Sequence, residues 1–552
     1  MPSVSLLLLS LLSLLSLSSS QSPSGTLIDC GTVNVYTING LKWLPDNDYV
    51  TGGIPKNVTV AVAVPTLSTV RSFPNKLHQK FCYVVPVFRG GKYLVRTTYF
   101  YGGVNGRDSP PVFDQMVDGT FWSEVNTTVD YVHGLASYYE GVFLAQGKHM
   151  SLCIGSNNYT DSDPFISALE FVPLEESVYN STDFGKFGLR LIARHSFGYS
   201  GADNIRYPDD PFDRFWEPLV DNKKPEPGNL NVSVSGFWNL PPSKIFKTAL
   251  ATRPAERMEL TWPPVFLSSS RYYIALYFAD NPSSSREGTR VFDIIINGIP
   301  YHRNLNVTPD GVAVFATHWP LSGATNITLN PAPGSNKGPL INGGEIFQVL
   351  ELGGRTLTRD VIVSLYGPSF LVAVIALETL RNSLQNPPLD WSGDPCLPHG
   401  YSWTGITCTY DRRIRIVTLN LTNMGLSGSL PSNISRLTAL SGIWLGNNNL
   451  SGTIPDLSSL MRLETLHLED NQFSGEIPSS LGKIQSLREL GQSISITGKH
   501  AKLQVIWCSL SVLHTVFLQN NNLTGQIPSS LIKPGLNLKT SPGNQLSSPP
   551  PS

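Results

Sequence analysis

A repeat of 23 to 24 residues in the C-terminal third restricts the fold of this chain more than any other feature of its sequence. Pro431, Pro455 and Pro478 close successive copies of the pattern L-x-x-L-x-L-x-x-N-x-L-x-G-x-I-P. Eight positions recur in register over four copies, which begin at residues 416, 440, 463 and 487. A repeat of this length predicts a solenoid, in which each copy adds one short strand and the leucines stack into a continuous core.

The segment from Gly491 to Val516 interrupts the fourth copy, and its deletion restores the 24-residue spacing. As a further repeat the segment fits poorly, because the expected leucine falls on Gln492. We favour a retained intron or a gene-model error over a genuine insertion, and Ile362 to Val374 is a weaker case of the same kind. The end of the segment, from Leu513 onward, still satisfies the strand template, so the fourth strand can start there.

The residues between the repeat leucines are predicted to face the concave side of the solenoid, because side chains alternate along a strand. Trp444, His467, Glu469 and Phe517 fall at such positions in neighbouring copies. We expect them to form a ligand-binding patch, since aromatic side chains dominate binding surfaces. The alternative is a solvated strand face.

Residues 1–20 are predicted to be a secretory signal peptide, because LLLLSLLSLLSL is followed by small residues. The next apolar run, Val361 to Leu377, has 17 residues and is interrupted by Gly367 and Pro368, so it is short for a membrane span of about 20 residues. The chain is therefore expected to be secreted or to lie on the extracellular face of the plasma membrane. Eleven N-x-[ST] sequons are predicted glycosylation sites: Asn57, Asn126, Asn158, Asn180, Asn231, Asn306, Asn326, Asn420, Asn433, Asn449 and Asn522.

Composition and motifs exclude several classes of function. The formal net charge is −1 and 15% of the residues are charged, which argues against a nucleic-acid partner. The sequence has no nucleophile elbow, H-E-x-x-H, P-loop or dinucleotide fingerprint, and no C-x-x-C. We therefore expect no catalytic residues, no cofactor, no metal and no enzyme activity. A carbohydrate-active enzyme with two facing carboxylates is the remaining enzymatic alternative.

The N-terminal two-thirds is predicted to be mainly β, with short alternating strands between clusters of Gly, Pro, Asn and Asp. YLVRTTYFYG (93–102) resembles YYIALYFAD (272–280), and PVFDQMVDG (111–119) resembles RVFDIIING (290–298). This internal similarity predicts two β-sandwich lobes, at about 27–198 and 205–355. Between them, Asp209, Asp210 and Asp213 lie among arginines and are expected to form structural ion pairs.

Motifs along this whole region resemble the plant malectin-like extracellular domain. They include Ile28-Asp29-Cys30-Gly31, Arg71-Ser72-Phe73-Pro74, Arg206-Tyr207-Pro208-Asp209-Asp210 and Asn342-Gly343-Gly344-Glu345. The G-x-I-P form of the repeat resembles the plant extracellular leucine-rich-repeat class. The expected organisation is a malectin-like domain over 21–360, a linker and repeat cap over 361–412, repeats over 413–540 and a Pro/Ser-rich tail over 541–552.

The resemblance also implies particular residues. Malectin binds a diglucose through aromatic side chains and a carboxylate, which points to Tyr99, Tyr101 and Phe113 with Asp114 as the polar partner. The alternative is that these rings are sandwich core. Cys396 and Cys408 resemble the paired cysteines of the family's repeat cap, so they are expected to form a disulfide. The pairing of Cys30, Cys82, Cys153 and Cys508 stays open.

The architecture resembles plant receptor-like proteins with malectin-like and leucine-rich-repeat regions. It implies an extracellular protein that binds a peptide or a cell-wall carbohydrate, in partnership with a membrane receptor kinase and with a role as co-receptor. A soluble secreted binder, an inhibitor or a decoy isoform is the alternative.

Overall fold

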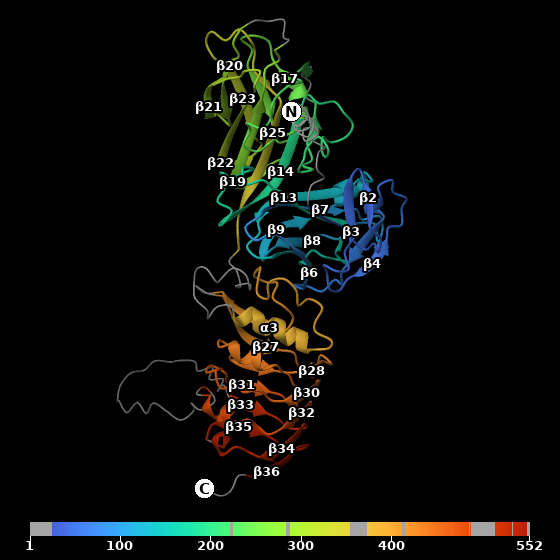
Figure 1. Ribbon diagram of the computed structural model, residues 1–552, viewed down its shortest axis with the longest axis vertical. Helices are drawn as coiled ribbons and strands as arrows, with labels where there is room; N and C mark the ends of the chain where they lie inside the picture. The colour runs from blue at the N-terminus through green and yellow to red at the C-terminus, as the bar shows by residue number, and fades with distance from the viewer. Residues whose placement is uncertain are drawn as a thin grey trace, which may run out of the picture.

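The computed structural model describes residues 25–220, 225–282, 288–353, 372–410, 414–484, 486, 514–532 and 534–548. The protein is elongated, with two β lobes at one end and a solenoid at the other (Figure 1). The suspect segment 362–374 falls almost wholly outside the described residues, and so does Gly491 to Leu513 of the other suspect segment.

One sheet of 11 strands runs through both lobes. Gly141 pairs with Arg190 and Val142 with Leu189, and these pairs join the lobes. Residues 187–197 pair along their length with residues 343–351, so they belong to the second lobe and not, as the sequence predicts, to the first. Both faces of the sheet are covered near this seam, so its strands are buried nearly throughout. In spatial order the strands are β2 (Tyr36–Ile38), β3 (Leu41–Pro45), β1 (Thr26–Asp29), β13 (Ala168–Leu174), β7 (Lys92–Tyr99), β10 (Ser137–Leu144), β14 (Phe187–Phe197), β25 (Gly343–Glu351), β19 (Leu267–Phe278) and β22 (Val312–Gly323), with β15 (Glu217–Leu219) beside β14.

Smaller sheets complete each sandwich. In the first lobe they are β6 (Lys80–Pro86), β11 (His149–Gly155), β8 (Phe113–Val117) and β9 (Thr120–Val125), and then β12 (Phe165–Ile166), β5 (Thr69–Ser72) and β4 (Ile54–Asn57). In the second lobe they are β18 (Met258–Thr261), β23 (Asn326–Pro331), β20 (Val291–Ile296) and β21 (Ile299–Asn306), and then β16 (Pro225–Pro227), β17 (Thr248–Ala251) and β24 (Leu340–Ile341). The short helices of the lobes are η1 (Pro65–Leu67), α2 (Thr128–Val132) and η2 (Ser243–Lys247).

A buried ion-pair network lies at the seam between the lobes. Glu140 accepts a hydrogen bond from Arg96 at 2.8 Å and forms an ion pair with Arg194 at 2.7 Å, and Arg194 also donates to Glu345 at 2.9 Å. Burial raises the pKa of Glu140, but the two guanidinium charges outweigh it and hold that pKa below its usual range. Charges at such depth are stable only when they are paired.

The aspartates of the inter-lobe motif join similar pairs, as expected: Asp210 with Arg214 at 2.9 Å, and Asp213 with Arg206 at 2.6 Å.

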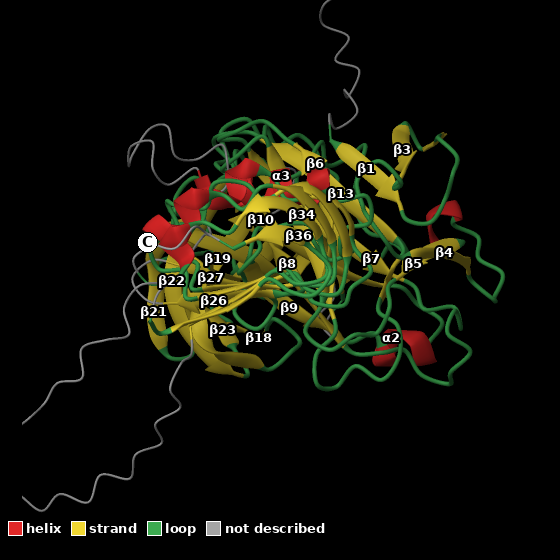
Figure 2. Ribbon diagram, turned by 90° about the horizontal axis from the view of Figure 1, so that it is seen from below, coloured by secondary structure: helices red, strands yellow, loops and turns green. Residues whose placement is uncertain are grey.

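The solenoid has two sheets whose strands are mostly parallel. One sheet forms the concave side, and the other contains the strand that follows the turn of each coil (Figure 2). The concave sheet contains β26 (Ile406–Tyr410), β27 (Ile414–Asn420), β29 (Gly442–Trp444), β31 (Thr465–His467), β33 (His514–Phe517) and β35 (Leu536–Lys539), of which β26 alone is antiparallel. The second sheet contains β28 (Ser427–Ser429), β30 (Asn449–Thr453), β32 (Gln472–Gly475), β34 (Asn522–Gln526) and β36 (Gln545–Ser547). The helical turns are η3 (Ser432–Arg436), η4 (Ser479–Lys483) and η5 (Ser529–Leu531), and α3 (Val372–Ser383) precedes the first coil.

The solenoid differs from the sequence prediction at two places. Strand β33 takes His514, Thr515 and Val516 from the suspect segment, and Val516 is fully buried, so the template match at this point is a real strand. Strand β36 lies beyond residue 540, where a tail is expected, and pairs with β34. Asn544 completes this fifth coil, because its side chain donates to the Leu518 carbonyl at 2.8 Å and accepts from the Leu523 amide at 2.9 Å.

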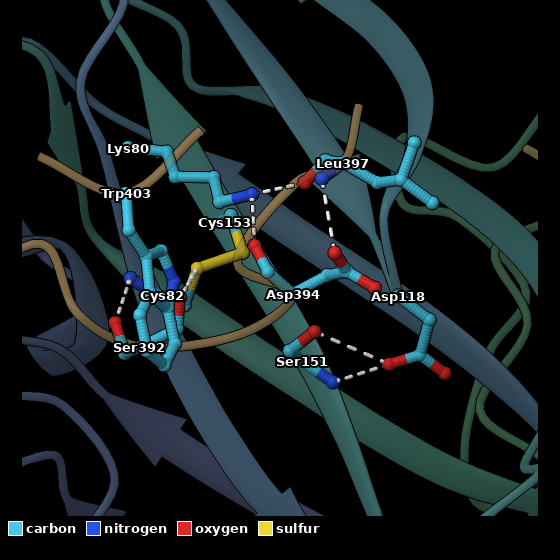
Figure 3. Close-up of a disulfide and its surroundings, with 9 residues drawn as sticks. All are labelled: Lys80, Cys82, Asp118, Ser151, Cys153, Ser392, Asp394, Leu397 and Trp403. Atoms are coloured by element: carbon cyan, nitrogen blue, oxygen red, sulfur yellow. Dashed lines mark hydrogen bonds between the residues drawn. A yellow bond between two sulfur atoms is a disulfide. The ribbon is translucent and has the colours of Figure 1, made fainter. Parts of the chain in front are cut away.

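The repeat cap lies directly against the first lobe, around the disulfide Cys82–Cys153 (Figure 3). These cysteines are cross-strand neighbours on β11 and β6. The Lys80 ammonium reaches out of β6 and donates to the carbonyl of Asp394 at 2.6 Å and to that of Leu397. The lobes and the solenoid therefore share a buried polar junction.

Candidate functional site

The aromatic residues predicted as a sugar platform lie inside the first lobe. Tyr99, Tyr101 and Phe113 are at most 2% exposed. The rings of Tyr99 and Phe113 are 5.6 Å apart, edge to face, and the Tyr99 hydroxyl donates to Gln115 at 2.8 Å. A buried ring offers no face to a sugar, so the predicted platform is wrong and these residues are sandwich core.

Asp114, the predicted polar partner, also has a structural role. Its carboxylate accepts hydrogen bonds from the Asn157 amide and the Tyr401 hydroxyl, each at 2.7 Å. Tyr401 belongs to the repeat cap, so Asp114 holds the cap against the first lobe. Asp114 as a sugar ligand stays a prediction, now without the aromatic platform beside it.

The candidates on the solenoid come together as a row across the concave sheet. Trp444 pairs with His467, and His467 with Phe517, in the register of three parallel strands. The His467 and Phe517 rings stack with centroids 4.3 Å apart, and the Trp444 ring lies edge-on to His467 at 6.3 Å. All three side chains are half-buried, so the row presents a partly open aromatic surface.

Two charged residues complete this concave row. The Lys539 ammonium lies over the Phe517 ring, 4.6 Å from its centroid, and pairs with it in register on β35. Glu469 Oε1 lies 3.6 Å from His467 Nδ1, and Gly446 leaves the space that this carboxylate occupies. Glu469 Oε2 is buried and has no hydrogen-bond partner among the described residues. The row therefore offers a ligand an aromatic stack with a cation and a carboxylate beside it.

Burial sets the protonation of the row. Burial and the charge of Lys539 both lower the pKa of His467, so the imidazole is neutral at neutral pH. Its Nε2 atom lies 2.8 Å from the Thr515 hydroxyl. Burial raises the pKa of Glu469, and the nearby charge of Asp470 adds to the shift.

Sequence reasoning missed Lys539 and Thr515 because both fall outside the four recognised repeats. It also missed a cleft of about 750 Å³ between the two lobes. The described chain shows no group of three or more potential ligands placed to hold a metal ion, and no helix in that part is long and apolar enough to span a membrane.

The cysteine pairs and the sequons are placed as follows. The expected Cys396–Cys408 disulfide is present in the repeat cap. Cys30 is a buried free thiol, and Cys508 lies outside the described residues. Ten of the eleven sequon asparagines are exposed, and Asn433 is half-buried. Glycosylation at these positions stays a prediction.

Known families and relatives match most of this sequence. A family model described as the malectin-like domain matches residues 28–349, and the leucine-rich-repeat model matches residues 462–484 and 512–533. A probable LRR receptor-like serine/threonine-protein kinase of Arabidopsis thaliana is 30% identical in an alignment of 478 residues that covers 81% of this chain and 48% of the relative. A second Arabidopsis receptor-like kinase is 29% identical over 439 residues, 76% of this chain and 47% of the relative.

The chain thus spans about half the length of the curated relatives that it matches. Among solved structures, that of the plant peptide RALF23 in complex with FER and LLG2 aligns with a TM-score of 0.50 and 17% identity, over 59% of this chain and 96% of that chain. This last likeness concerns the fold. Because the malectin-like model covers more than half of the sequence, the chain belongs to the malectin-like domain family and carries a leucine-rich-repeat solenoid after that domain.

Proposed function

We propose that this protein is an extracellular receptor-like recognition protein that binds a peptide or cell-wall carbohydrate ligand on the concave row of its solenoid. The observation that carries the proposal is the alignment of Trp444, His467, Phe517 and Lys539 on four successive strands. Aromatic residues that are half-open and held by a rigid sheet contribute strongly to binding, because they lose little conformational freedom.

The comparisons support the receptor-like part of the proposal. The matched relatives are named receptor-like kinases, and a protein of similar fold occurs in a complex with the peptide RALF23. By analogy, a membrane receptor kinase is the proposed partner, and the extracellular face of the plasma membrane or the cell wall is the proposed location.

The sequon at Asn420 limits where a ligand can lie. Asn420 pairs with Trp444 in register and is exposed. A glycan on Asn420 covers the Trp444 end of the row, so the ligand should approach from the Lys539 end. This end also carries the Lys539 ammonium, over the Phe517 ring.

The test uses the secreted full-length chain, probed with an array of plant cell-wall oligosaccharides and a library of synthetic secreted plant peptides. At least one ligand should bind the unmodified protein, and Phe517→Ala should weaken its binding about ten-fold or more. Met461→Ala is the matched control, because Met461 is an exposed apolar residue of the solenoid outside the row. The proposal fails if every ligand found binds the Phe517→Ala variant as well as the unmodified chain.

A further inference from the structure

The inter-lobe cleft has a floor of sheet residues and a rim of loops, and none of the candidate residues described above lies in it. Its floor is formed where β10, β14, β25 and β19 lie side by side, at the seam between the lobes. Arg190 pairs with Gln348, and Gln348 pairs with Tyr272, so these three residues form one row across the floor. A volume of about 750 Å³ is within the range of small-ligand sites.

Arg190 has no partner among the residues that the structure describes. Across the described chain, its guanidinium makes no hydrogen bond and no ion pair, although it is half-buried. Arg194, four residues further along the same strand, is bound to both Glu140 and Glu345. A partly desolvated cation without a counterion is costly, and a bound anion would offset that cost.

Gln348 places a second donor beside Arg190. Its side-chain amide also has no hydrogen-bond partner among the described residues, and it shares the cleft face. A guanidinium binds a carboxylate through two parallel hydrogen bonds, and a neighbouring amide can donate to the same group. The floor therefore presents a receptor for one carboxylate.

The rim of the cleft adds apolar surface. Phe266 is 85% exposed and Val265 is 50% exposed, in the turn that joins β18 to β19. Leu135, on the opposite rim after α2, is also exposed. Exposed apolar side chains gathered at the mouth of a cleft are typical of a binding surface.

Acidic residues in the same cleft determine which anion fits. Glu217 accepts from the Tyr138 hydroxyl at 2.5 Å and lies 3.5 Å from His195 Nε2, and Asp130 accepts from Ser137. Burial lowers the pKa of His195, so the imidazole does not neutralise Glu217. Glu140 also lines the cleft, but Arg96 and Arg194 neutralise it. The other two carboxylates, beside the guanidinium of Arg190, repel a polyuronate chain but suit a ligand that has one acidic and one basic group.

We propose that the cleft binds a peptide segment whose carboxylate is held by Arg190 and Gln348, while an apolar side chain packs on Phe266 and a basic group faces Glu217 and Asp130. The carboxylate comes either from a peptide C-terminus or from an internal acidic residue, since both present the same chemistry. This inference rests on the proposed function only in requiring an extracellular ligand, and it concerns a surface separate from the concave row.

Small probes with defined groups test the cleft in the full chain. N-acetyl-Lys-Phe as the free acid carries all three groups, its C-terminal amide lacks the carboxylate, and N-acetyl-Asp-Phe amide carries a side-chain carboxylate. Ligand-observed NMR up to millimolar concentration measures each affinity. The free acid should bind about ten times more tightly than its amide, because a hydrogen bond to a charged group contributes a factor of this order.

Variants assign the effect to the floor of the cleft. Arg190→Gln should lower the affinity for the free acid about ten-fold and leave the affinity for the amide unchanged. Phe266→Ala should lower the affinity for both probes. Because Phe266 lies on the surface, this variant should fold and can test the cleft even if Arg190→Gln does not fold. Arg303→Gln is the matched control: Arg303 is an exposed strand arginine of β21, far from the cleft, and its replacement should change nothing.

The outcomes separate this proposal from the proposed function. Binding of N-acetyl-Asp-Phe amide that depends on Arg190 supports the cleft and assigns the carboxylate to a side chain. The cleft proposal is overturned if acid and amide bind alike, if Arg190→Gln and Arg303→Gln behave alike, if no probe saturates, or if oligogalacturonate alone binds through Arg190. Failure of the cleft proposal in these tests leaves the proposed function standing, because a ligand whose binding needs Phe517 and not Arg190 lies on the concave row.

Discussion

The Tyr401 hydroxyl of the repeat cap donates a hydrogen bond of 2.7 Å to the Asp114 carboxylate of the first lobe, across 287 residues of sequence. Burial raises the pKa of Tyr401, and the carboxylate raises it further, so the phenol keeps its proton throughout the neutral range. The Tyr401 ring also lies so close to Gly155 that a Cβ there would stand 2.5 Å from it. The two regions therefore interlock through a side chain and a glycine as well as through this bond.

Tyr401→Phe should lower the free energy of unfolding by about 1 to 2 kcal/mol, because it removes one partner of a partly buried charge-assisted hydrogen bond and keeps the ring. Urea unfolding monitored by fluorescence measures the change. Tyr159→Phe is the control, since Tyr159 is 75% exposed and its hydroxyl has no hydrogen-bond partner in the described chain. Equal midpoints for the two variants would show that the bond adds nothing to the junction.

Gly393 lets the cap reach the Cys82–Cys153 disulfide. A Cβ at Gly393 would stand 2.7 Å from Cys82 Sγ and 3.0 Å from Cys153 Sγ, whereas one at Gly400 would meet nothing within 4 Å. Both glycines have positive φ, +67° and +92°, so replacement by alanine strains the backbone at each. Gly393→Ala should therefore lower the melting temperature more than Gly400→Ala, by the equivalent of about 1 to 3 kcal/mol of overpacking. Similar losses for both would mean that the cap does not pack on the disulfide.

Lys80 makes the stability depend on alkaline pH. Burial lowers its pKa to about 8 in the folded protein, below the ordinary value of 10.5 that applies to the unfolded chain. Between these values the unfolded chain binds more protons than the folded one, so the free energy of unfolding should rise with pH, by up to about 1.4 kcal/mol per pH unit. Lys92, whose pKa burial also lowers to about 8, contributes a similar slope.

Lys80→Met should reduce this slope by about half between about pH 8 and about pH 9.5, before the tyrosines of the unfolded chain ionise. The variant should also be less stable at pH 7, because the carbonyls of Asp394 and Leu397 lose their donor. Urea midpoints at a series of pH values measure both effects, and Lys483→Met is the exposed control. If the free energy of unfolding of Lys80→Met rises with pH as steeply as that of the unmodified chain, a group other than Lys80 causes the pH dependence.

The solenoid was the most predictable part of the structure, because one template fixes which residues face inward at every coil. The register that aligns Trp444 with His467 and Phe517 follows directly from the repeat. The fifth coil escaped prediction because its asparagine is displaced. Asn521 follows Val516 by five residues, as the template requires, whereas Asn544 follows Leu538, the residue that pairs with Val516, by six.

The lobes were less predictable because alternation on a strand does not say which face is open. Strand β7 lies inside a sheet that is covered on both sides, so Tyr99 is as buried as its neighbours. The junction and the cleft depend on contacts between distant segments. The sequence FGLRLIARHSF contains two arginines four residues apart, and only the tertiary structure shows that Arg194 is paired while Arg190 has no partner in the described ranges.

The charge of Lys539 should be measurable at His467. Lys539 disfavours the imidazolium, so Lys539→Gln should raise the pKa of His467 toward its ordinary value while burial still keeps it below. An NMR titration of the His467 ring protons measures the shift. Lys483→Gln, which removes a cation from the η4 turn, should leave the His467 titration unchanged. If His467 has the same pKa in Lys539→Gln and Lys483→Gln, the Lys539 ammonium does not lie close to the His467 ring.

The fifth coil can be tested through its asparagine. Asn544→Ala removes donors to the carbonyls of Leu518 and Thr540, at 2.8 and 2.9 Å, and the acceptor for the Leu523 amide. Unsatisfied backbone groups of this kind cost about 1 to 3 kcal/mol in total when water reaches some of them, so the urea midpoint should fall. Gln545→Ala, at the exposed neighbouring position, is the matched control and should change the free energy of unfolding by less than about 0.5 kcal/mol. If Asn544→Ala lowers the urea midpoint no more than Gln545→Ala, the fifth coil does not contribute to the stability of the solenoid. Strand β35, which carries Lys539, belongs to that coil. The variant therefore also tests the Lys539 end of the proposed binding row.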